Sequence, residues 1–391
     1  MTLVEPQTRI IQPNYDIEAL RAQFPITERW AYFNHAGISP LANPVYRAQE
    51  KMLSDLREHG SVLFETDLYT NLHAQLVNRI GTLINADPDE IALVQNTGTG
   101  MSIIAGGVQL NASANIIICD KEFPANVYPW MHLADRIDGE LRIVPPDNGG
   151  LTVRRLQEHV DENTSIVSVS SVEFLTGHRT ELKALGEYCH AKDILFVVDG
   201  IQSLGHVPID VKEMQIDFLA TGGMKSLLGP PGIGFLYVRR ELLDGLTPIL
   251  IGAASVTDFR NWTKYHWDLR PEAGRFEMGT PNIVGIAGLN AALGMLLDLG
   301  IENIDAWTTQ LADRLMDDLD RRGYEILTPR ESEHHAHIVT WSPEDPQAAF
   351  ELLNDNHVKT APREGYLRAA LHCYNSEIEI MRIGEILGER G

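Results

Sequence analysis

Short apolar runs rich in β-branched residues alternate with longer amphipathic stretches through most of the chain. Alternation of this kind predicts an α/β fold, with a mostly parallel sheet sandwiched between helices. The run 194–198 is apolar at every position, as expected for a strand whose two faces are both buried. We predict a seven-stranded sheet from residues 91–95, 115–119, 141–144, 165–170, 194–199, 218–221 and 234–238. Helices are predicted between or before these strands, among them 44–59, 67–85, 153–160 and 182–191.

The first of these helices has a recognisable start. Asn43 is a residue type that caps helices, and Pro44 suits the first helical position because no amide proton is needed there. We therefore expect Asn43 to cap this helix and Pro44 to be its first residue.

After about Pro281 the pattern changes to longer helices with fewer strands between them. Ser376 followed by Glu379 forms a capping box for a C-terminal helix, because each side chain satisfies a free amide of the first turn. The other predicted elements of this region are helices at 284–299 and 304–322 and strands at 337–341 and 367–373.

This change of pattern predicts two domains. The larger one spans residues 31–283 and would hold the ligand, and a smaller α+β domain spans 284–391. The N-terminal segment, 1–30, is expected to pack beside the smaller domain.

Composition narrows the class of protein. The 391 residues suffice for one or two large domains, and 44% hydrophobic residues are ordinary for a globular protein. No apolar run approaches the roughly 18 residues that cross a bilayer, and the start lacks the layout of a signal peptide. The three cysteines, Cys119, Cys189 and Cys373, are too few and too scattered for a disulfide framework or a zinc site. We expect a cytoplasmic protein without a metal site.

The formal net charge is -22. Nucleic acids and anionic membranes bind cationic surfaces, so neither is expected as a partner. A small anionic ligand remains compatible with this charge, because a few backbone amides and one arginine act locally.

Two charged residues follow two successive predicted strands. Asp199 ends an apolar strand that breaks at Gly200, and Lys225 follows the next strand in an apolar, glycine-flanked segment. Ligands of open α/β sheets bind beyond the carboxyl ends of strands, where desolvation makes an amine more nucleophilic. Taken alone, Asp199 is more simply a helix cap and Lys225 a solvated surface group. Together they are the acid for a pyridinium nitrogen and the amine for an aldehyde that pyridoxal phosphate requires.

Two weaker signals agree with this cofactor. The segment NTGTG, residues 96–100, lies between a predicted strand and an apolar helix, where amides and hydroxyls can bind a phosphate. A plain helix cap explains it equally well, and it lacks the lysine of a P-loop and the spacing of a dinucleotide site. Phe123 follows the strand 115–119, where it could stack on a planar ring or simply belong to the core.

These motifs together resemble a known family. They run in order from NHAGISPL near residue 34 through NTGTG, EFPANVYPW, VDGIQSLGHVPIDV and the Lys225 segment to RFEMGTPNIVGIAGLNAAL and LRAALHCYN. The chain is similar to fold-type I pyridoxal phosphate enzymes of the class V aminotransferase group. That group includes cysteine desulfurases, selenocysteine lyases and isopenicillin N epimerase-like proteins. The resemblance covers nearly the whole chain and implies an amino-acid substrate.

The resemblance also implies a role for each matching residue. Lys225 would hold the cofactor as a Schiff base and later move the Cα proton of the substrate, and Asp199 would pair with the pyridinium nitrogen. Gln202 would bind the phenolic oxygen, and Phe123 would stack on the ring where many relatives have histidine. The residues implied to hold the phosphate are Thr97, Gly98 and Thr99.

A homodimer is implied by a second contact to the phosphate. In such enzymes a Gly-Thr pair like Gly279-Thr280 reaches the cofactor of the neighbouring subunit. Thr280 could also cap the helix that follows Pro281.

Arg368 matches the arginine that binds the substrate carboxylate in relatives, and a guanidinium fork suits that role. On the predicted strand 367–373, Cys373 lies on the opposite face from Arg368, which indicates a buried, inert thiol. Desulfurases that resemble this chain carry a nucleophilic cysteine in a loop shortly before this arginine. Residues 356–367 contain no cysteine and the segment is short, and Met224 stands where many relatives have histidine. Persulfide-forming chemistry is therefore disfavoured.

Three functions stay open. We favour a lyase that eliminates a β-substituent from a cysteine-like or other β-substituted amino acid. An aminotransferase or epimerase of specialised metabolism, and a homologue that binds the cofactor without catalysis, are the alternatives. The substrate side chain could be bound by the aromatic-rich region 252–267 or by residues such as His35, His178, Trp262 and Arg363, which the sequence does not rank.

Overall fold

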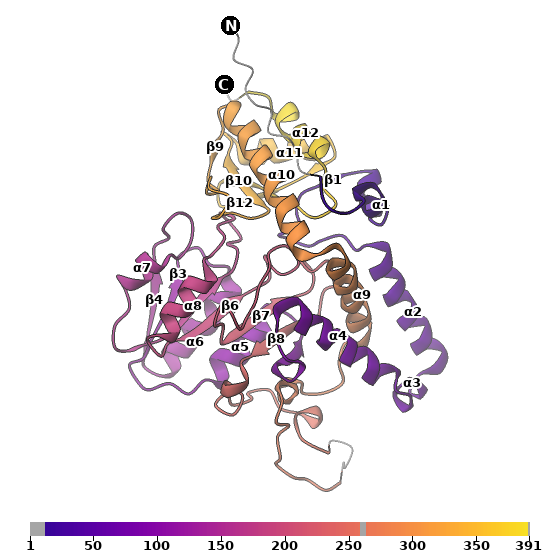
Figure 1. The fold of residues 1–391 in the computed structure, drawn as a ribbon, viewed down its shortest axis with the longest axis vertical. Helices are drawn as coiled ribbons and strands as arrows, with labels where there is room; N and C mark the ends of the chain where they lie inside the picture. Colours follow the sequence, from indigo (N-terminus) through magenta and orange to yellow (C-terminus); the bar gives the residue numbers. More distant parts are fainter. Residues whose placement is uncertain (1–11, 259–262, 390–391) are drawn as a thin grey trace.

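The structure is a computed structural model that describes residues 12–258 and 263–389. Its larger part is built on a seven-stranded sheet in the order β2-β8-β7-β6-β5-β3-β4 (Figure 1). Within this sheet β8 is antiparallel to both neighbours, and the other pairs are parallel. The predicted fold class is confirmed, and each strand lies within one residue of its predicted bounds: β2 (Ile91–Val94), β3 (Asn115–Cys119), β4 (Glu140–Val144), β5 (Thr164–Ser170), β6 (Leu195–Asp199), β7 (Phe218–Gly222) and β8 (Gly234–Val238).

Helices cover both faces of this sheet, and the core lies between them and the strands. Consecutive residues of β6 belong to different apolar clusters: Val198 packs with residues of α4, α8 and α9, and Val197 packs with residues of α5 and α6. This explains why the strand is apolar at every position. The helices of this part are α2 (Asn43–His59), α3 (Val62–Glu65), α4 (Leu68–Ile84), α5 (Thr97–Gly107), α6 (Tyr128–Arg136), α7 (Val153–Gln157), α8 (Leu182–His190) and α9 (Ile283–Leu299).

The C-terminal part contains an antiparallel sheet in the order β12-β13-β10-β9. The apolar residues of this sheet and of the helices beside it form a separate cluster. Trp341 of the sheet and Leu315 of a neighbouring helix belong to this cluster. The elements are α10 (Ile301–Arg321), β9 (Glu325–Ile326), β10 (Ile338–Ser342), α11 (Pro346–Asp355), β12 (Ala361–Arg363), β13 (Tyr366–Ala370) and α12 (Glu377–Leu387). The predicted domain boundaries themselves stay a prediction.

The described start of the chain packs against this C-terminal part (Figure 1). β1 (Ala31–Tyr32) pairs in parallel with β11 (Val358–Lys359). Arg21, the last residue of α1 (Ile17–Arg21), forms an ion pair of 2.6 Å with Glu379 of α12. These contacts bring Tyr32 and the residues after it to the junction between the two sheets.

Some local predictions were wrong. Asn43 is the first residue of α2 rather than its cap, because its side chain donates to the carbonyl of Ala22 at 3.4 Å. The strand predicted at 367–373 ends at Ala370, since the chain turns where the Asn375 side chain accepts from the His372 amide. The capping box of Ser376 and Glu379 at α12 is confirmed.

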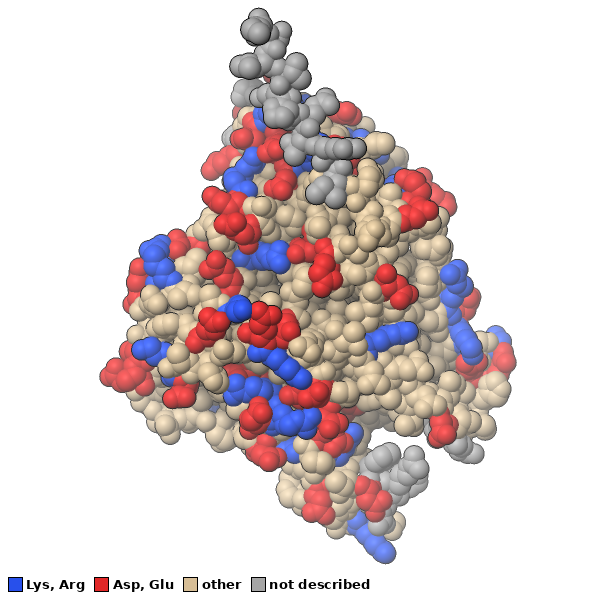
Figure 2. Space-filling view, in the orientation of Figure 1, with Lys and Arg blue, Asp and Glu red and all other residues tan. Residues whose placement is uncertain are grey.

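Among the described residues, no single helix is both long and apolar enough to cross a membrane. Taken together, α9 and α10 have the length and composition of a membrane span, but the two helices are bent by 79° relative to each other. On the face shown in Figure 2, acidic and basic side chains are interspersed and no broad basic patch is visible.

Candidate active site

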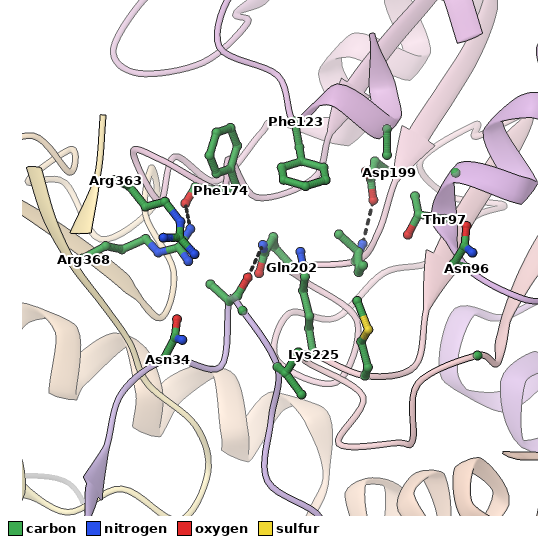
Figure 3. A pocket seen from close by; sticks show the side chains of 18 of the residues that line it. Asn34, Asn96, Thr97, Phe123, Phe174, Asp199, Gln202, Lys225, Arg363 and Arg368 are labelled. Atoms are coloured by element: carbon green, nitrogen blue, oxygen red, sulfur yellow. Dashed lines mark hydrogen bonds between the residues drawn. The ribbon is translucent and has the colours of Figure 1, made fainter. Parts of the chain in front are cut away.

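A cavity of about 660 Å³ lies beyond the carboxyl ends of β6 and β7. Its walls come from the large sheet, from α5, from the β12–β13 hairpin and from the segment after β1. Figure 3 shows the arginines on one side of it, Asp199 and Thr97 on the other, and Lys225 with Phe123 between them. Of the predicted site residues, those that line the cavity are Thr97, Gly98, Phe123, Asp199, Gln202, Lys225 and Arg368.

Asp199 ends β6 and is 1% exposed. Its Oδ1 accepts a hydrogen bond from the Ile201 amide at 2.9 Å, while Oδ2 has no partner among the described residues. Desolvation raises the pKa of Asp199 to about 6, against the opposing effects of the Ile201 amide and the Lys225 charge. A cationic ring N–H at Oδ2 would satisfy this oxygen and stabilise the carboxylate form.

Lys225 follows β7 and is 6% exposed. Its Nζ lies 4.9 Å from the centre of the Phe123 ring, and its carbonyl accepts from the Ser39 hydroxyl at 2.7 Å. Desolvation lowers the pKa of Lys225 to about 8; Asp199 opposes this shift and the two arginines of the cavity add to it. About a tenth of the amine is therefore unprotonated at pH 7, far more than for an exposed lysine, and this neutral form is the one that attacks an aldehyde.

The start of α5 can bind an anion. Asn96 caps this helix by accepting from the Thr99 amide at 2.9 Å. The Thr97 hydroxyl is buried and has no partner in the described part of the chain. A Cβ at Gly100 would lie 2.7 Å from the Ala220 Cβ, so glycine allows the helix to pack this closely on β7. The helix start is thereby held beside Asp199 with free donors for a phosphate.

Arg368 lies on β13 and is 2% exposed. Its Nη1 donates to the carbonyl of Phe174 at 2.5 Å, and its Nε is buried with no partner within residues 12–258 and 263–389. Desolvation lowers the pKa of Arg368 to about 9, and Arg363 adds to the shift. A ligand carboxylate would supply the missing acceptor.

The remaining contacts complete the fit to the cofactor. Gln202 donates one N–H to the Ala36 carbonyl at 3.2 Å, which leaves its second N–H for a phenolic oxygen. The buried atoms without partners, Asp199 Oδ2, Thr97 Oγ1 and Arg368 Nε, match a pyridinium nitrogen, a phosphate and a substrate carboxylate. The residues present therefore suit pyridoxal phosphate together with an amino acid.

Thr99 and Thr280 lie elsewhere. Both line a neighbouring surface cavity of about 320 Å³, and Thr280 is exposed in the single chain. Asn282, not Thr280, caps α9 by accepting from the Gly285 amide at 2.9 Å. The helix-cap reading of Thr280 is therefore wrong, and the implied phosphate contacts of both threonines stay predictions.

The sequence missed Phe174, which packs edge-on against Phe123 with ring centres 5.4 Å apart. Phe174 follows the carboxyl end of β5, and residues at such ends often line the ligand site of an α/β sheet. Its position after a predicted strand could therefore have identified it as a site residue. Of the residues left unranked for the side-chain pocket, Arg363 lines the cavity, and neither His35 nor His178 does. Trp262 lies outside the described residues.

Three buried histidines meet next to the Lys225 segment. The rings of His206 and His337 stack at 3.7 Å, and that of His372 lies 3.9 Å from His206. His372 Nε2 donates to the carbonyl of Ser226 at 2.9 Å, because its Nδ1 accepts from the Cys373 amide. Desolvation lowers the pKa of all three, that of His372 to about 4, so the rings are neutral at neutral pH.

We expect this cluster to make the protein sensitive to acid. The pKa of each ring in the folded protein is below the unfolded value of about 6.5, so unfolding takes up protons as the pH falls below 6.5. The free energy of unfolding should fall less steeply in His337→Phe between pH 6.5 and 5, by up to about 1.4 kcal/mol per pH unit at the lower end of this range. Denaturant titrations across this range measure it, with the exposed His132→Asn as control. An unchanged slope would contradict the expectation.

Comparisons with known proteins identify the family of the chain. The sequence profile described as Aminotransferase class-V matches residues 31–383. A Pyrococcus abyssi protein named “Probable cysteine desulfurase” is 29% identical over 391 residues, which cover 95% of this chain and 97% of that protein. A Bacillus subtilis protein named “Uncharacterized aminotransferase YcbU” is 30% identical over 363 residues, which cover 93% and 95%.

Solved structures share the fold. A cysteine desulfurase from Thermococcus onnurineus NA1, in its apo form, superimposes with a TM-score of 0.88 at 26% identity, covering 97% of this chain and 98% of its own. A cystine C–S lyase in complex with cysteine persulfide gives a TM-score of 0.86 at 24% identity, covering 94% and 100%. At that identity the second likeness concerns the fold alone. Since the family profile spans most of the chain, the protein belongs to the class V aminotransferase family and is a pyridoxal phosphate-dependent enzyme.

Proposed function

We propose that the protein is a lyase that eliminates a β-substituent from a cysteine-like or other β-substituted amino acid, without an enzyme thiol. The observation that carries this proposal is the hairpin that bears Arg368. β12 and β13 are joined by Glu364 and Gly365 alone, and both residues have the positive φ values, 48° and 85°, of a tight turn. This hairpin leaves no room for a cysteine-bearing loop.

The cysteines support the same proposal. Cys119, Cys189 and Cys373 are each at most 1% exposed, and none lines the cavity. Burial raises the pKa of all three thiols, which keeps them protonated and unreactive. A sulfur leaving the substrate would thus have no enzyme thiol to accept it and would depart on its own fragment.

The lining residues can perform the steps of an elimination. The bound cofactor supplies the electron sink that makes the Cα proton acidic. Arg368 would bind the α-carboxylate and orient the Cα–H bond, and Lys225 would remove the proton. Met224 carries no transferable proton, and the Tyr32 hydroxyl donates to the carbonyl of Ile38 at 2.5 Å. Lys225 is therefore the group best suited to move protons here.

Product analysis tests the proposal. The cofactor-loaded enzyme is incubated with β-substituted amino acids, and pyruvate, ammonia and the released fragment are measured. Equal amounts of pyruvate and ammonia are expected. A keto acid that keeps the β-substituent would indicate transamination instead, inversion at Cα would indicate epimerisation, and a cofactor spectrum that responds to no amino acid would indicate binding without catalysis.

Cys373→Ala should leave the elimination rate within about twofold of the wild type. The side chain packs in the core, so the expected cost is a loss of stability of about 1 kcal/mol. Rates are compared at a temperature where both proteins stay folded. Loss of activity in a folded variant would show that a thiol takes part.

We further propose a homodimer in which Thr280 reaches the partner's cofactor phosphate. Met278, Ile249 and Ile251 near it are 39–44% exposed in the single chain, as expected for side chains that a second copy covers. Light scattering should give twice the 43.6 kDa mass of the chain, and Thr280→Val should weaken cofactor retention without changing that mass. A monomer with full activity would refute this.

A further inference from the structure

A second arginine, Arg363, lines the same cavity as Arg368. The two differ in burial: Arg368 is 2% exposed, whereas Arg363 is an exposed residue at the edge of the cavity. In Figure 3 both side chains extend from the hairpin toward the region of Lys225. The deeper guanidinium is the one assigned to the α-carboxylate, which leaves Arg363 without a role in the proposed function.

The register of the hairpin explains why both side chains reach one cavity. Arg363 is paired with Tyr366, and Ala361 is paired with Arg368. Paired residues share a face of the sheet and alternate residues return to it, so Arg363 and Arg368 stand on the same face as diagonal neighbours. Such neighbours lie about 7–8 Å apart at Cα, which is a separation that two groups of one ligand can span.

Neither arginine has an acidic partner in the part of the chain that the structure describes. Within residues 12–258 and 263–389, no carboxylate forms an ion pair with Arg363 or Arg368, although the chain has 54 acidic and 32 basic residues. The hydrogen bond that Arg363 makes is to the carbonyl of its neighbour Pro362, at 2.7 Å. Two cations are thus kept side by side in a protein with a large excess of acids. One substrate carboxylate balances one of them and leaves the other for a further anion.

We propose that Arg363 binds a second carboxylate, carried by the β-substituent of the substrate. This inference rests on the proposed function for the position of the α-carboxylate at Arg368. The substrate class is then a β-substituted amino acid whose leaving group ends in an acid. Because Arg363 lies nearer to solvent, that acid points to the mouth of the cavity, where the fragment leaves after the Cα–H and Cβ–substituent bonds break.

Two ligands of the same shape test the charge. S-carboxymethyl-cysteine carries the distal carboxylate, and S-carbamoylmethyl-cysteine replaces it with a neutral amide. Both are titrated into cofactor-loaded Lys225→Ala protein, which cannot turn them over, and binding is followed by the visible absorption of the cofactor. The acid should bind about tenfold more tightly than the amide, the scale of one partly exposed charge-assisted contact.

Variants of Arg363 locate the contact. In the same background Arg363→Gln should remove the preference for the acid and leave the amide unaffected, and Arg363→Lys should keep part of it. Arg382→Gln is the control, since this surface arginine of α12 bonds the Asn356 carbonyl outside the cavity. Equal binding of the two ligands, or equal weakening of both by Arg363→Gln, overturns the inference; the second result would mean that both arginines share the α-carboxylate.

Turnover separates this inference from the proposed function. If wild-type enzyme forms pyruvate from both ligands with equal kcat/KM, elimination stands and the role of Arg363 is refuted. If binding depends on the distal charge and on Arg363 but no pyruvate forms, the elimination is refuted and the acidic substrate class stands.

Discussion

Lys225→Ala should lower turnover by at least about 10²–10⁴-fold, the range for a group that transfers a proton at the reacting carbon. The amine lies between Asp199 and the arginines, and burial lowers its pKa to about 8. Among the described residues that line the cavity, Lys225 is the only lysine. The cofactor should still bind, held by the start of α5 and by Asp199, but without a covalent link. Mass spectrometry after borohydride reduction and the visible spectrum measure the two effects.

Lys359→Ala is a matched control for this variant. Lys359 also lies over an aromatic ring, with its Nζ 4.7 Å from the centre of Phe350, but outside the cavity. It should keep full activity and a reducible cofactor link. Near-normal turnover by Lys225→Ala, or a reduced link at another lysine, would contradict the assignment of the site.

Arg368→Ala should weaken amino-acid binding by roughly 2–5 kcal/mol, the scale for removing one partner of a buried charge pair. Among the described residues, the buried guanidinium bonds only the Phe174 carbonyl and its Nε has no partner, so most of its hydrogen-bonding capacity is left for a ligand. The amine analogue of the substrate that lacks a carboxylate should bind equally to both proteins. Absorption titrations give the two dissociation constants.

Arg368→Lys tests whether charge alone suffices. A point charge cannot reproduce the fork of donors, so this variant should recover only part of the affinity. If Arg368→Ala binds the amino acid as tightly as the wild type does, the carboxylate site lies elsewhere. Arg363, the other arginine that lines the cavity, would then be the candidate for this site.

The strands of the large sheet were predictable because their signal is local. Each is a short apolar run that ends at a polar or glycine residue, as at Asp199-Gly200 and at Gly222-Gly223 before Lys225. Since parallel strands present their carboxyl ends at one edge, two such endings already predict one site. Helix ends were predicted less well, because the Asn43 side chain bonds to Ala22, which the local pattern does not reveal.

The sequence by itself predicted the fold class and placed Asp199 and Lys225 at the ends of successive strands, because hydrophobic periodicity and strand ends depend on residues close together in the chain. The cofactor was implied by this pair together with the resemblance of the motifs to a known family. Only the tertiary structure decided that Phe174 packs against Phe123, that Arg363 shares a face and a cavity with Arg368, and that Thr280 stays apart from both. These relations depend on strand register and on contacts between segments far apart in the chain. The pattern of neighbouring residues carries no information about such distances.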